Sequence, residues 1–217
     1  MNGTLAQAER GTHHGRLIGR VLARLYRVRV EGADRVPASG PVVLVSNHSS
    51  AADGPLLFTV TPRPVHFLIK VEMFTGPLRP FLHHLAQIPV DRSRGDRAAL
   101  TSALDVLRQG GVVGIFPEGT RGQGDVAQVQ QGAAWLALQS GAEVVPVALV
   151  GTLPTRRNRL DLPRPGSRLR AVYGEPFRVS VTDAEGRTVP GRERLRLASA
   201  QVRDHLAAHV VRARSEV

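Results

Sequence analysis

The sequence predicts an α/β fold with a largely parallel central sheet flanked by helices. Short valine-rich runs have the length of buried strands, and amphipathic segments of helical periodicity lie between them. Glycine and proline stand at most of the boundaries, and strands that alternate with helices favour a parallel sheet. With 217 residues, 42% of them hydrophobic and 22% charged, the chain has the length and composition of a single globular domain.

Apolar runs place the strands along the chain. We expect buried strands at residues 41–46, 65–69, 86–90, 112–116, 144–150 and 168–172. The segment 72–85 contains Gly76, Pro77 and Pro80, so broken helix and loop are expected there.

Helical periodicity and capping residues place the helices between these strands. We expect helices at residues 53–60, 97–109, 132–140 and 193–211. Asp96 is the expected N-cap of the second helix, and Gly110 follows its end.

The N-terminal residues differ in character from the rest. From Arg16 to Arg29, apolar residues recur at helical spacing beside a row of arginines. This pattern is typical of a helix lying in a membrane interface, and it equally fits a first helix packed on the core with a solvated arginine face. We therefore divide the chain into a tail with an amphipathic membrane-interface helix, residues 1–30, and a main domain, residues 31–217.

Neither a signal-peptide core nor a membrane-spanning run is visible in the sequence. Residues 1–12 contain no continuous apolar core, and no window approaches the length of a spanning helix. We expect the chain to be made and kept in the cytoplasm, as a peripheral or monotopic protein on the cytoplasmic side of the membrane.

The charge balance indicates an anionic partner. The formal net charge is +11, and Lys70 is the only lysine among 29 basic residues. Anionic lipid, phosphorylated small molecules or nucleic acid would suit this charge, and a GC-rich coding habit also explains the arginine bias. A nucleic-acid module is not expected, because aromatic residues make up only 4% of the chain. Cysteine is absent, which excludes disulfides, cysteine metal ligands and a cysteine acyl-enzyme.

The first candidate site follows the strand expected at 41–46. His48 leaves this strand, and Asp53 stands five residues later in the first turn of a helix. The carboxylate can accept from one ring nitrogen of the histidine and leave the other nitrogen as a general base. Capping of the turn and helix by the same two residues is the structural alternative.

Three further strand ends carry cationic or turn residues. Residues 116–121, Phe-Pro-Glu-Gly-Thr-Arg, follow one strand and offer a hydroxyl, backbone N–H groups and a guanidinium that suit a phosphate. Arg92 and Lys70 follow two other strands. In an open α/β sheet, ligands bind at the carboxyl ends of the strands, so these groups are expected to converge.

These blocks resemble those of the glycerolipid acyltransferases of the 1-acylglycerol-3-phosphate (lysophosphatidic acid) acyltransferase type. The first block, Asn-His-x4-Asp, is matched at Asn47, His48 and Asp53, and the third, Phe-Pro-Glu-Gly-Thr-Arg, is complete at residues 116–121. The second is matched at residues 88–92, and the fourth at residues 145–149, which include Pro146. The resemblance covers about residues 35–180, with the blocks within 41–180.

The resemblance implies transfer of a fatty acyl group from a thioester, acyl-CoA or acyl carrier protein, to the free hydroxyl of a lysophospholipid. It implies His48 as the base, Asp53 as its partner, and no metal or other cofactor. The acceptor phosphate would be held by Lys70, Arg92 and Arg121, with donors from Gly119 and Thr120. Glu118 would order the glycerol or the arginine side chains. The expected acceptor is 1-acylglycerol 3-phosphate, and the expected further partner is an anionic membrane surface.

Alternatives remain open on the sequence. The acceptor could be another glycerophospholipid or polar lipid, and Ser49 or Ser50 could carry a covalent acyl intermediate. A non-catalytic lipid-binding protein of the membrane surface would not need His48 and Asp53. The other histidines are expected to be structural or exposed.

Overall fold

The computed structural model describes residues 19, 21–22, 24–91, 95–117, 126–154, 162–181, 189 and 191–216. Within these residues, eight strands form one sheet in the order β1-β7-β6-β2-β5-β3-β4, and β8 pairs with β6. The strands are β1 (Arg27–Glu31), β2 (Val42–Ser46), β3 (Val65–Lys70), β4 (Ile88–Val90), β5 (Val112–Ile115), β6 (Glu143–Val150), β7 (Arg168–Tyr173) and β8 (Phe177–Arg178).

The sheet is largely parallel, as predicted. β4, β3, β5, β2 and β6 form a continuous parallel block. β7 and β8 pair antiparallel with β6, and β1 pairs parallel with β7. β2 lies in the middle of the sheet and is buried along its whole length, which explains its continuous apolar sequence.

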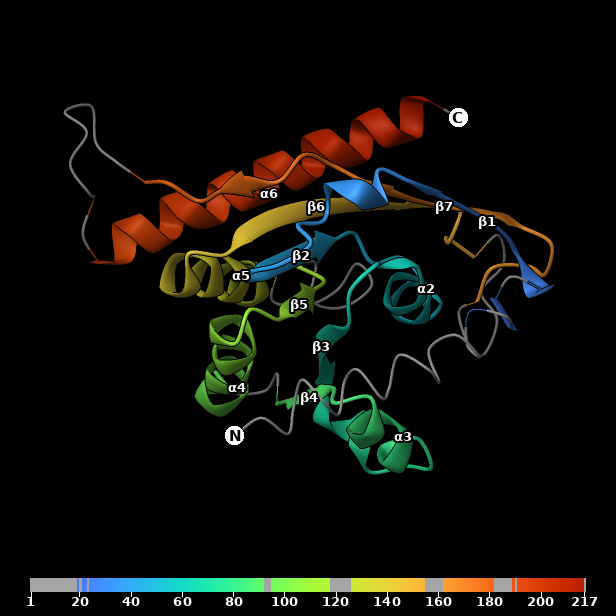
Figure 1. Ribbon diagram of the computed structural model, residues 1–217, viewed down its shortest axis with the longest axis horizontal. Coiled ribbons are helices and arrows are strands. Elements are labelled where there is room, and N and C mark those ends of the chain that lie inside the picture. Colours follow the sequence, from blue (N-terminus) through green and yellow to red (C-terminus); the bar gives the residue numbers. More distant parts are fainter. Residues whose placement is uncertain are drawn as a thin grey trace.

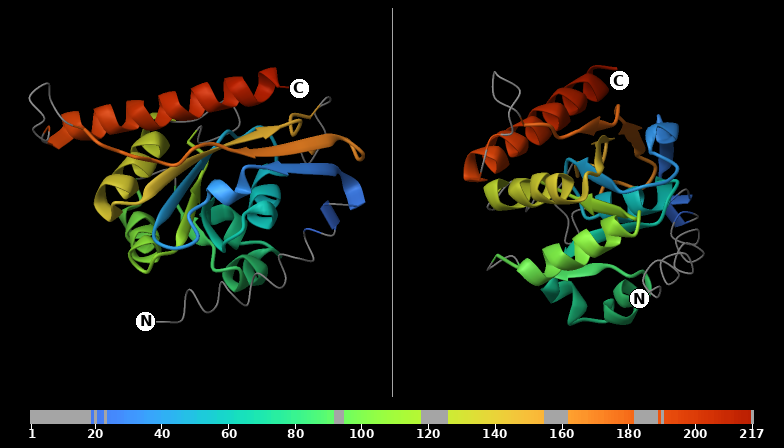
Figure 2. Two further views of the ribbon diagram at one scale, coloured as in Figure 1. Left: turned by 45° about the horizontal axis from the view of Figure 1, so that its top comes forward. Right: turned by 60° about the vertical axis from the view of Figure 1, so that its left-hand side comes forward.

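Helices cover both faces of the sheet. The helical elements are α2 (Asp53–Val60), α3 (Arg79–His84), α4 (Arg97–Arg108), α5 (Val126–Ser140) and α6 (Gly191–Ser215), with short 3-10 turns η1 (Ala33–Arg35) and η2 (Val71–Phe74). The core on one face joins the sheet to α4, α5 and α6, and the core on the other face joins it to α2 and to Leu22 and Tyr26 (Figures 1 and 2). Strand residues alternate between the two cores, so the α/β class with flanking helices is confirmed.

The N-terminal segment differs from its prediction. The backbone is helical at the described residues 19, 21–22 and 24–25, but the chain is extended from Arg27 and forms β1 at the edge of the sheet. The prediction that a helix extends to Arg29 is therefore wrong. Leu22 is buried in the core, whereas Val21 and Leu25 are exposed, so the helical residues pack on the domain and also present apolar side chains to solvent.

Most other elements lie within a few residues of their predicted bounds. α2 has the predicted bounds, α5 begins six residues earlier than expected, and α6 extends beyond both predicted ends. β4 is shorter, because Ala86 adopts a left-handed backbone conformation with φ of 52° just before it. The short strand β8 was not predicted.

Candidate active site

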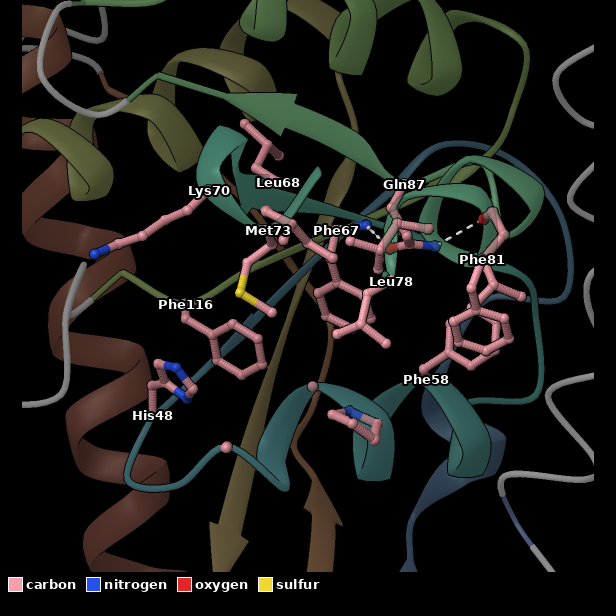
Figure 3. A pocket seen from close by; sticks show the side chains of 16 residues that line it. His48, Phe58, Phe67, Leu68, Lys70, Met73, Leu78, Phe81, Gln87 and Phe116 are labelled. Carbon is pink, nitrogen blue, oxygen red and sulfur yellow. Dashed lines mark hydrogen bonds between the residues drawn. The ribbon is translucent and has the colours of Figure 1, made fainter. Parts of the chain in front are cut away.

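The site lies where three neighbouring parallel strands end. β2, β5 and β3 are adjacent in the sheet, so their carboxyl ends lie along the same edge. His48 follows β2, Phe116 follows β5, and Lys70 is the last residue of β3. All three line one cavity (Figure 3).

Asn47 fixes the point at which the chain leaves β2. Its Nδ2 donates to the Leu149 carbonyl at 2.9 Å, and its Oδ1 accepts from the Leu149 N–H at 2.8 Å. The side-chain amide therefore makes the two hydrogen bonds that a further backbone residue of β2 would make with β6. Because Asn47 is 2% exposed, this pairing is protected from water and sets the start of the loop that carries His48.

Asp53 gathers three donors on one carboxylate oxygen. Its Oδ2 accepts from His48 Nδ1 at 2.9 Å, from the Ser49 N–H at 2.6 Å and from the Ser50 N–H at 2.7 Å. Asp53 is completely buried at the first residue of α2, where the helix dipole favours a negative charge. The carboxylate thus shapes the loop and holds the histidine, so the capping role and the catalytic role coincide in one group.

The pair has the geometry of a base with its orienting carboxylate. When Asp53 is ionised, its hydrogen bond with His48 requires the proton on Nδ1, which leaves a lone pair on Nε2. The His48 side chain is 20% exposed, whereas the Asp53 side chain is fully buried. The imidazole is therefore partly accessible from outside, whereas the carboxylate is not.

A cavity of about 680 Å³ opens beside this histidine. α2, β3, η2 and α3 supply most of its wall, and Figure 3 shows the side chains turned into it. Most of the lining residues are apolar: Ala51, Pro55, Phe58, Phe67, Leu68, Ile69, Met73, Leu78, Phe81, Leu82, Leu85 and Phe116. A cavity of this size and character suits an alkyl chain.

Gln87 is a polar residue in this apolar wall. Its Oε1 accepts from the Phe67 N–H at 2.8 Å, and its Nε2 donates to the carbonyls of Leu85 and Val65 at 2.8 and 3.2 Å. The side-chain amide of Gln87 thereby makes hydrogen bonds to the β3 backbone at residues that precede the pairing of β3 with β4. With its polar atoms used in this way, Gln87 does not add a free polar group to the cavity.

Lys70 lies on the same side of the cavity as His48, and its exposed side chain extends away from the apolar interior (Figure 3). The structure therefore brings together Asn47, His48, Asp53 and Lys70. Pro146 lies in β6 beside Val45, and its carbonyl accepts from the Gly174 N–H at 2.8 Å. The remaining predicted site residues lie outside the described residues: Arg92, Glu118, Gly119, Thr120 and Arg121.

Two serines, Ser49 and Ser50, follow the candidate base and make hydrogen bonds within its loop. Ser50 is completely buried, and its Oγ accepts from the Ala52 N–H at 3.0 Å. Ser49 and Ser50 both use their backbone N–H groups on Asp53. The contacts that these serines make therefore support the shape of the loop.

Histidines outside the site have structural contacts. His66 hydrogen-bonds to the Ala86 carbonyl through Nδ1 at 2.8 Å, and His209 to the Val172 carbonyl through Nε2 at 2.8 Å. Burial lowers the pKa of both side chains, so the fold favours their neutral forms.

Sequence reasoning missed the cavity and the aromatic residues around His48. The cavity wall comes from segments that are separate in sequence, and its members are ordinary core residues by composition. One signal was present: Gly114 interrupts a buried valine-rich strand, and a glycine there marks a close approach by another group.

A hydrogen-bonded histidine and carboxylate beside a large apolar cavity is an arrangement that suits an enzyme acting on a substrate with an alkyl chain. The acyltransferase family model matches residues 27–150 of the chain. The chain belongs to this family, and the resemblance to its 1-acylglycerol-3-phosphate acyltransferase type is confirmed.

Individual relatives agree with this assignment. A 1-acyl-sn-glycerol-3-phosphate acyltransferase of Bacillus subtilis is 29% identical over 170 residues, which cover 77% of this chain and 80% of the relative. The 1-acyl-sn-glycerol-3-phosphate acyltransferase alpha of Homo sapiens is 36% identical over 132 residues, and the match spans 47% of its length.

The fold is also that of a solved relative. The crystal structure of the 1-acyl-sn-glycerophosphate (LPA) acyltransferase PlsC from Thermotoga maritima superposes with a TM-score of 0.69 and 23% sequence identity. The similarity covers 95% of this chain and 79% of that chain, so it extends over the sheet and the helices on both of its faces.

Proposed function

We propose that this acyltransferase moves a fatty acyl group from a thioester, acyl-CoA or acyl carrier protein, to the free hydroxyl of 1-acylglycerol 3-phosphate, with phosphatidic acid as the product. The observation that carries the proposal is the His48 to Asp53 hydrogen bond of 2.9 Å at a cavity of about 680 Å³. The names of the relatives support the acceptor.

The proposed chemistry is direct transfer by general-base catalysis. His48 Nε2 takes the proton of the acceptor hydroxyl while the oxygen attacks the thioester carbonyl. The tetrahedral intermediate then breaks its C–S bond, and the leaving thiolate receives the proton from the imidazolium. Asp53 stabilises the imidazolium during both steps through Nδ1. No metal or other cofactor is required, because the thioester is already activated.

The apolar cavity is the proposed site of a fatty acyl chain. Each buried methylene contributes about 0.8 kcal/mol to the binding free energy. An acyl chain that lies in this cavity therefore gains enough binding free energy to hold the thioester carbonyl near His48. At the polar end of the cavity, the Lys70 ammonium group is proposed to approach the acceptor phosphate. Arg92, Gly119, Thr120 and Arg121 complete the proposed phosphate site, and Glu118 is proposed to order the glycerol or the arginine side chains.

Membrane attachment is proposed to be peripheral and on the cytoplasmic side, through the rim of the cavity. Met73, Leu78 and Phe81 line the cavity and are 45%, 47% and 37% exposed, and the exposed cations Lys70 and Arg79 lie beside them in sequence. An apolar rim with cations suits an anionic lipid surface. Among the described residues, none of the helices has the length and hydropathy that a membrane span requires.

The substrate assignment is tested by acyl transfer with a panel of acceptors. Purified protein is given palmitoyl-CoA or palmitoyl acyl carrier protein, and 1-acylglycerol 3-phosphate, glycerol 3-phosphate or lysophosphatidylcholine. The proposal predicts the highest kcat/KM with 1-acylglycerol 3-phosphate. A higher kcat/KM with another acceptor would contradict the assignment of 1-acylglycerol 3-phosphate as the acceptor. No transfer with any donor and acceptor pair would contradict the proposed function.

The membrane surface is tested by sedimentation with phosphatidylglycerol-containing vesicles. The triple variant Met73→Ser, Leu78→Ser, Phe81→Ser is expected to lose most of its binding. The control is Val211→Ser, which changes a 67% exposed apolar residue on α6, on the other side of the sheet from α3 (Figure 1). Equal binding of both variants would show that the cavity rim is not the membrane contact.

A further inference from the structure

Three rings from three adjacent segments form a column at the site. The ring of His48 lies over the ring of Phe116, with centroids 4.5 Å apart and planes inclined by 27°. Phe116 in turn lies beside Phe67, with centroids 5.6 Å apart and planes inclined by 10°. Figure 3 shows the three rings in a row from the histidine into the cavity. We call these three residues the ring column.

A glycine in the sheet makes room for this column. Gly114 on β5 pairs with Phe67 on β3. A Cβ atom at position 114 would lie 2.3 Å from Phe67 Cε1, so only glycine allows the Phe67 ring to lie across β5. Phe67 is 4% exposed, and its N–H is held by Gln87. The inner end of the ring column is therefore fixed by packing.

The contacts of His48 are divided between the edge and the face of its ring. Nδ1 at the edge is held by Asp53 at 2.9 Å, and one face is covered by Phe116. The hydrogen bond fixes the direction of the ring within its plane, and the stacked phenyl group fixes the tilt of that plane. Nε2 is then directed at one position beside the cavity.

We infer that Phe116 is a positioning residue that also stabilises the charged form of His48. This inference rests on the proposed role of His48 as the base. When the acceptor hydroxyl gives its proton to Nε2, the imidazole becomes a cation over the negative face of the phenyl ring. The contact is stronger after proton transfer than before it, so it lowers the barrier and does not simply bind the substrate. Phe67 supports Phe116 from the opposite side.

The test separates the electrostatic contribution of the ring from its volume. Phe116 is replaced by phenylalanines that carry one, two or three ring fluorines, which nearly preserve its shape and progressively weaken its negative face. We expect kcat to fall at each step, with a total loss of about 3- to 30-fold, while the KM for the acceptor changes less than twofold. Phe116→Tyr should retain most of the activity, and Phe116→Leu should lose about as much as the trifluorinated ring.

A second stacked pair provides the control. The ring of Phe177 on β8 stacks on the ring of His205 on α6, with centroids 3.9 Å apart and planes inclined by 21°. The same fluorinated series at position 177 should leave kcat unchanged. Unfolding temperatures are measured for all variants, so a loss of kcat at unchanged stability supports the inference.

The outcomes distinguish this inference from the proposed function. A flat series at position 116, or an equal loss at position 177, would overturn the role of the ring column even if His48→Ala is inactive. Near-normal turnover by His48→Ala would instead contradict the base assignment, and the inference with it.

Discussion

The side chain of Asn47 pairs with both backbone groups of Leu149, donating to the carbonyl at 2.9 Å and accepting from the N–H at 2.8 Å. One side chain thus joins the central strand to β6 at the residue that precedes the base. Asn47 is therefore a structural residue of the site, and His48 takes its direction from this pairing and from Asp53.

Asn47→Ala should destabilise the protein substantially. It leaves an N–H and a carbonyl of the 2% exposed Leu149 without partners, and we expect a loss of about 2–5 kcal/mol in the free energy of unfolding. Gln109→Ala is the control, because it removes a 3.1 Å hydrogen bond that Nε2 donates to the Asp105 carbonyl at the surface and should cost less than about 0.5 kcal/mol. Urea denaturation measures both values, and similar losses in the two variants would contradict a stabilising role for the pairing of Asn47 with Leu149.

Asp53→Asn should disable the base while leaving the loop folded. An amide oxygen in the place of Oδ2 can still accept from His48 Nδ1 and from the N–H groups of Ser49 and Ser50, but a neutral amide does not stabilise the imidazolium that forms when His48 takes the proton. We expect kcat to fall by about a thousandfold or more, by analogy with other base and carboxylate pairs. The exposed Asp34→Asn is the control in the same kinetic assay. A tenfold loss or less for Asp53→Asn would mean that the carboxylate only shapes the loop.

Gly114→Ala should be destabilising because of one neighbour. The added Cβ would lie 2.3 Å from Phe67 Cε1, and overpacking of this kind costs about 1–3 kcal/mol. In a protein with Phe67→Leu, the same substitution should cost clearly less, since the ring has been removed. A double-mutant cycle by thermal or urea unfolding gives the coupling. Equal costs in the two backgrounds would show that Phe67 is not the group that requires glycine.

The Glu31 and Arg170 pair should make stability depend on pH. Arg170 donates to both carboxylate oxygens at 2.9 and 3.1 Å, and these hydrogen bonds hold the pKa of Glu31 below its ordinary value of 4.5. A carboxyl with a lower pKa in the folded state stabilises the fold fully above its unfolded pKa, and this stabilisation is lost as the pH falls through the folded pKa.

Glu31→Gln tests this dependence. The wild-type protein should exceed the variant in unfolding free energy by a constant amount above about pH 6, and the difference should shrink below about pH 4.5. Glu193→Gln is the control, because Glu193 pairs with Arg196 on the exposed face of α6 and should contribute little. Urea denaturation over the pH range measures both differences. A difference for Glu31→Gln that does not change with pH would contradict the assignment.

Much of the fold could be predicted from the sequence, because its central strands are buried on both faces and α4 begins at a recognisable cap. Asp96, for example, accepts from the Ala99 N–H at the start of α4 as expected of an N-cap. The strand β1 was missed because the arginines and valines up to Arg29 also fit a helical period. Only pairing with β7 shows that they are extended.

The candidate site could be predicted in part for a related physical reason. Each motif follows a strand, and the parallel order of β2, β5 and β3 brings their ends together. The ring column and the cavity depend on packing between segments far apart in sequence, such as Phe67 against Phe116. Gly114 interrupts the buried strand β5 and leaves room for that packing.

The most direct test of the account is the rate of acyl transfer to 1-acylglycerol 3-phosphate by His48→Ala at saturating substrates. The histidine provides the base at the cavity, so kcat should fall by about a thousandfold or more while the unfolding temperature stays near that of the wild type. His205→Ala, which removes the histidine that stacks on Phe177, should retain normal turnover. Near-normal turnover by a folded His48→Ala protein would contradict the role of His48 as the catalytic base.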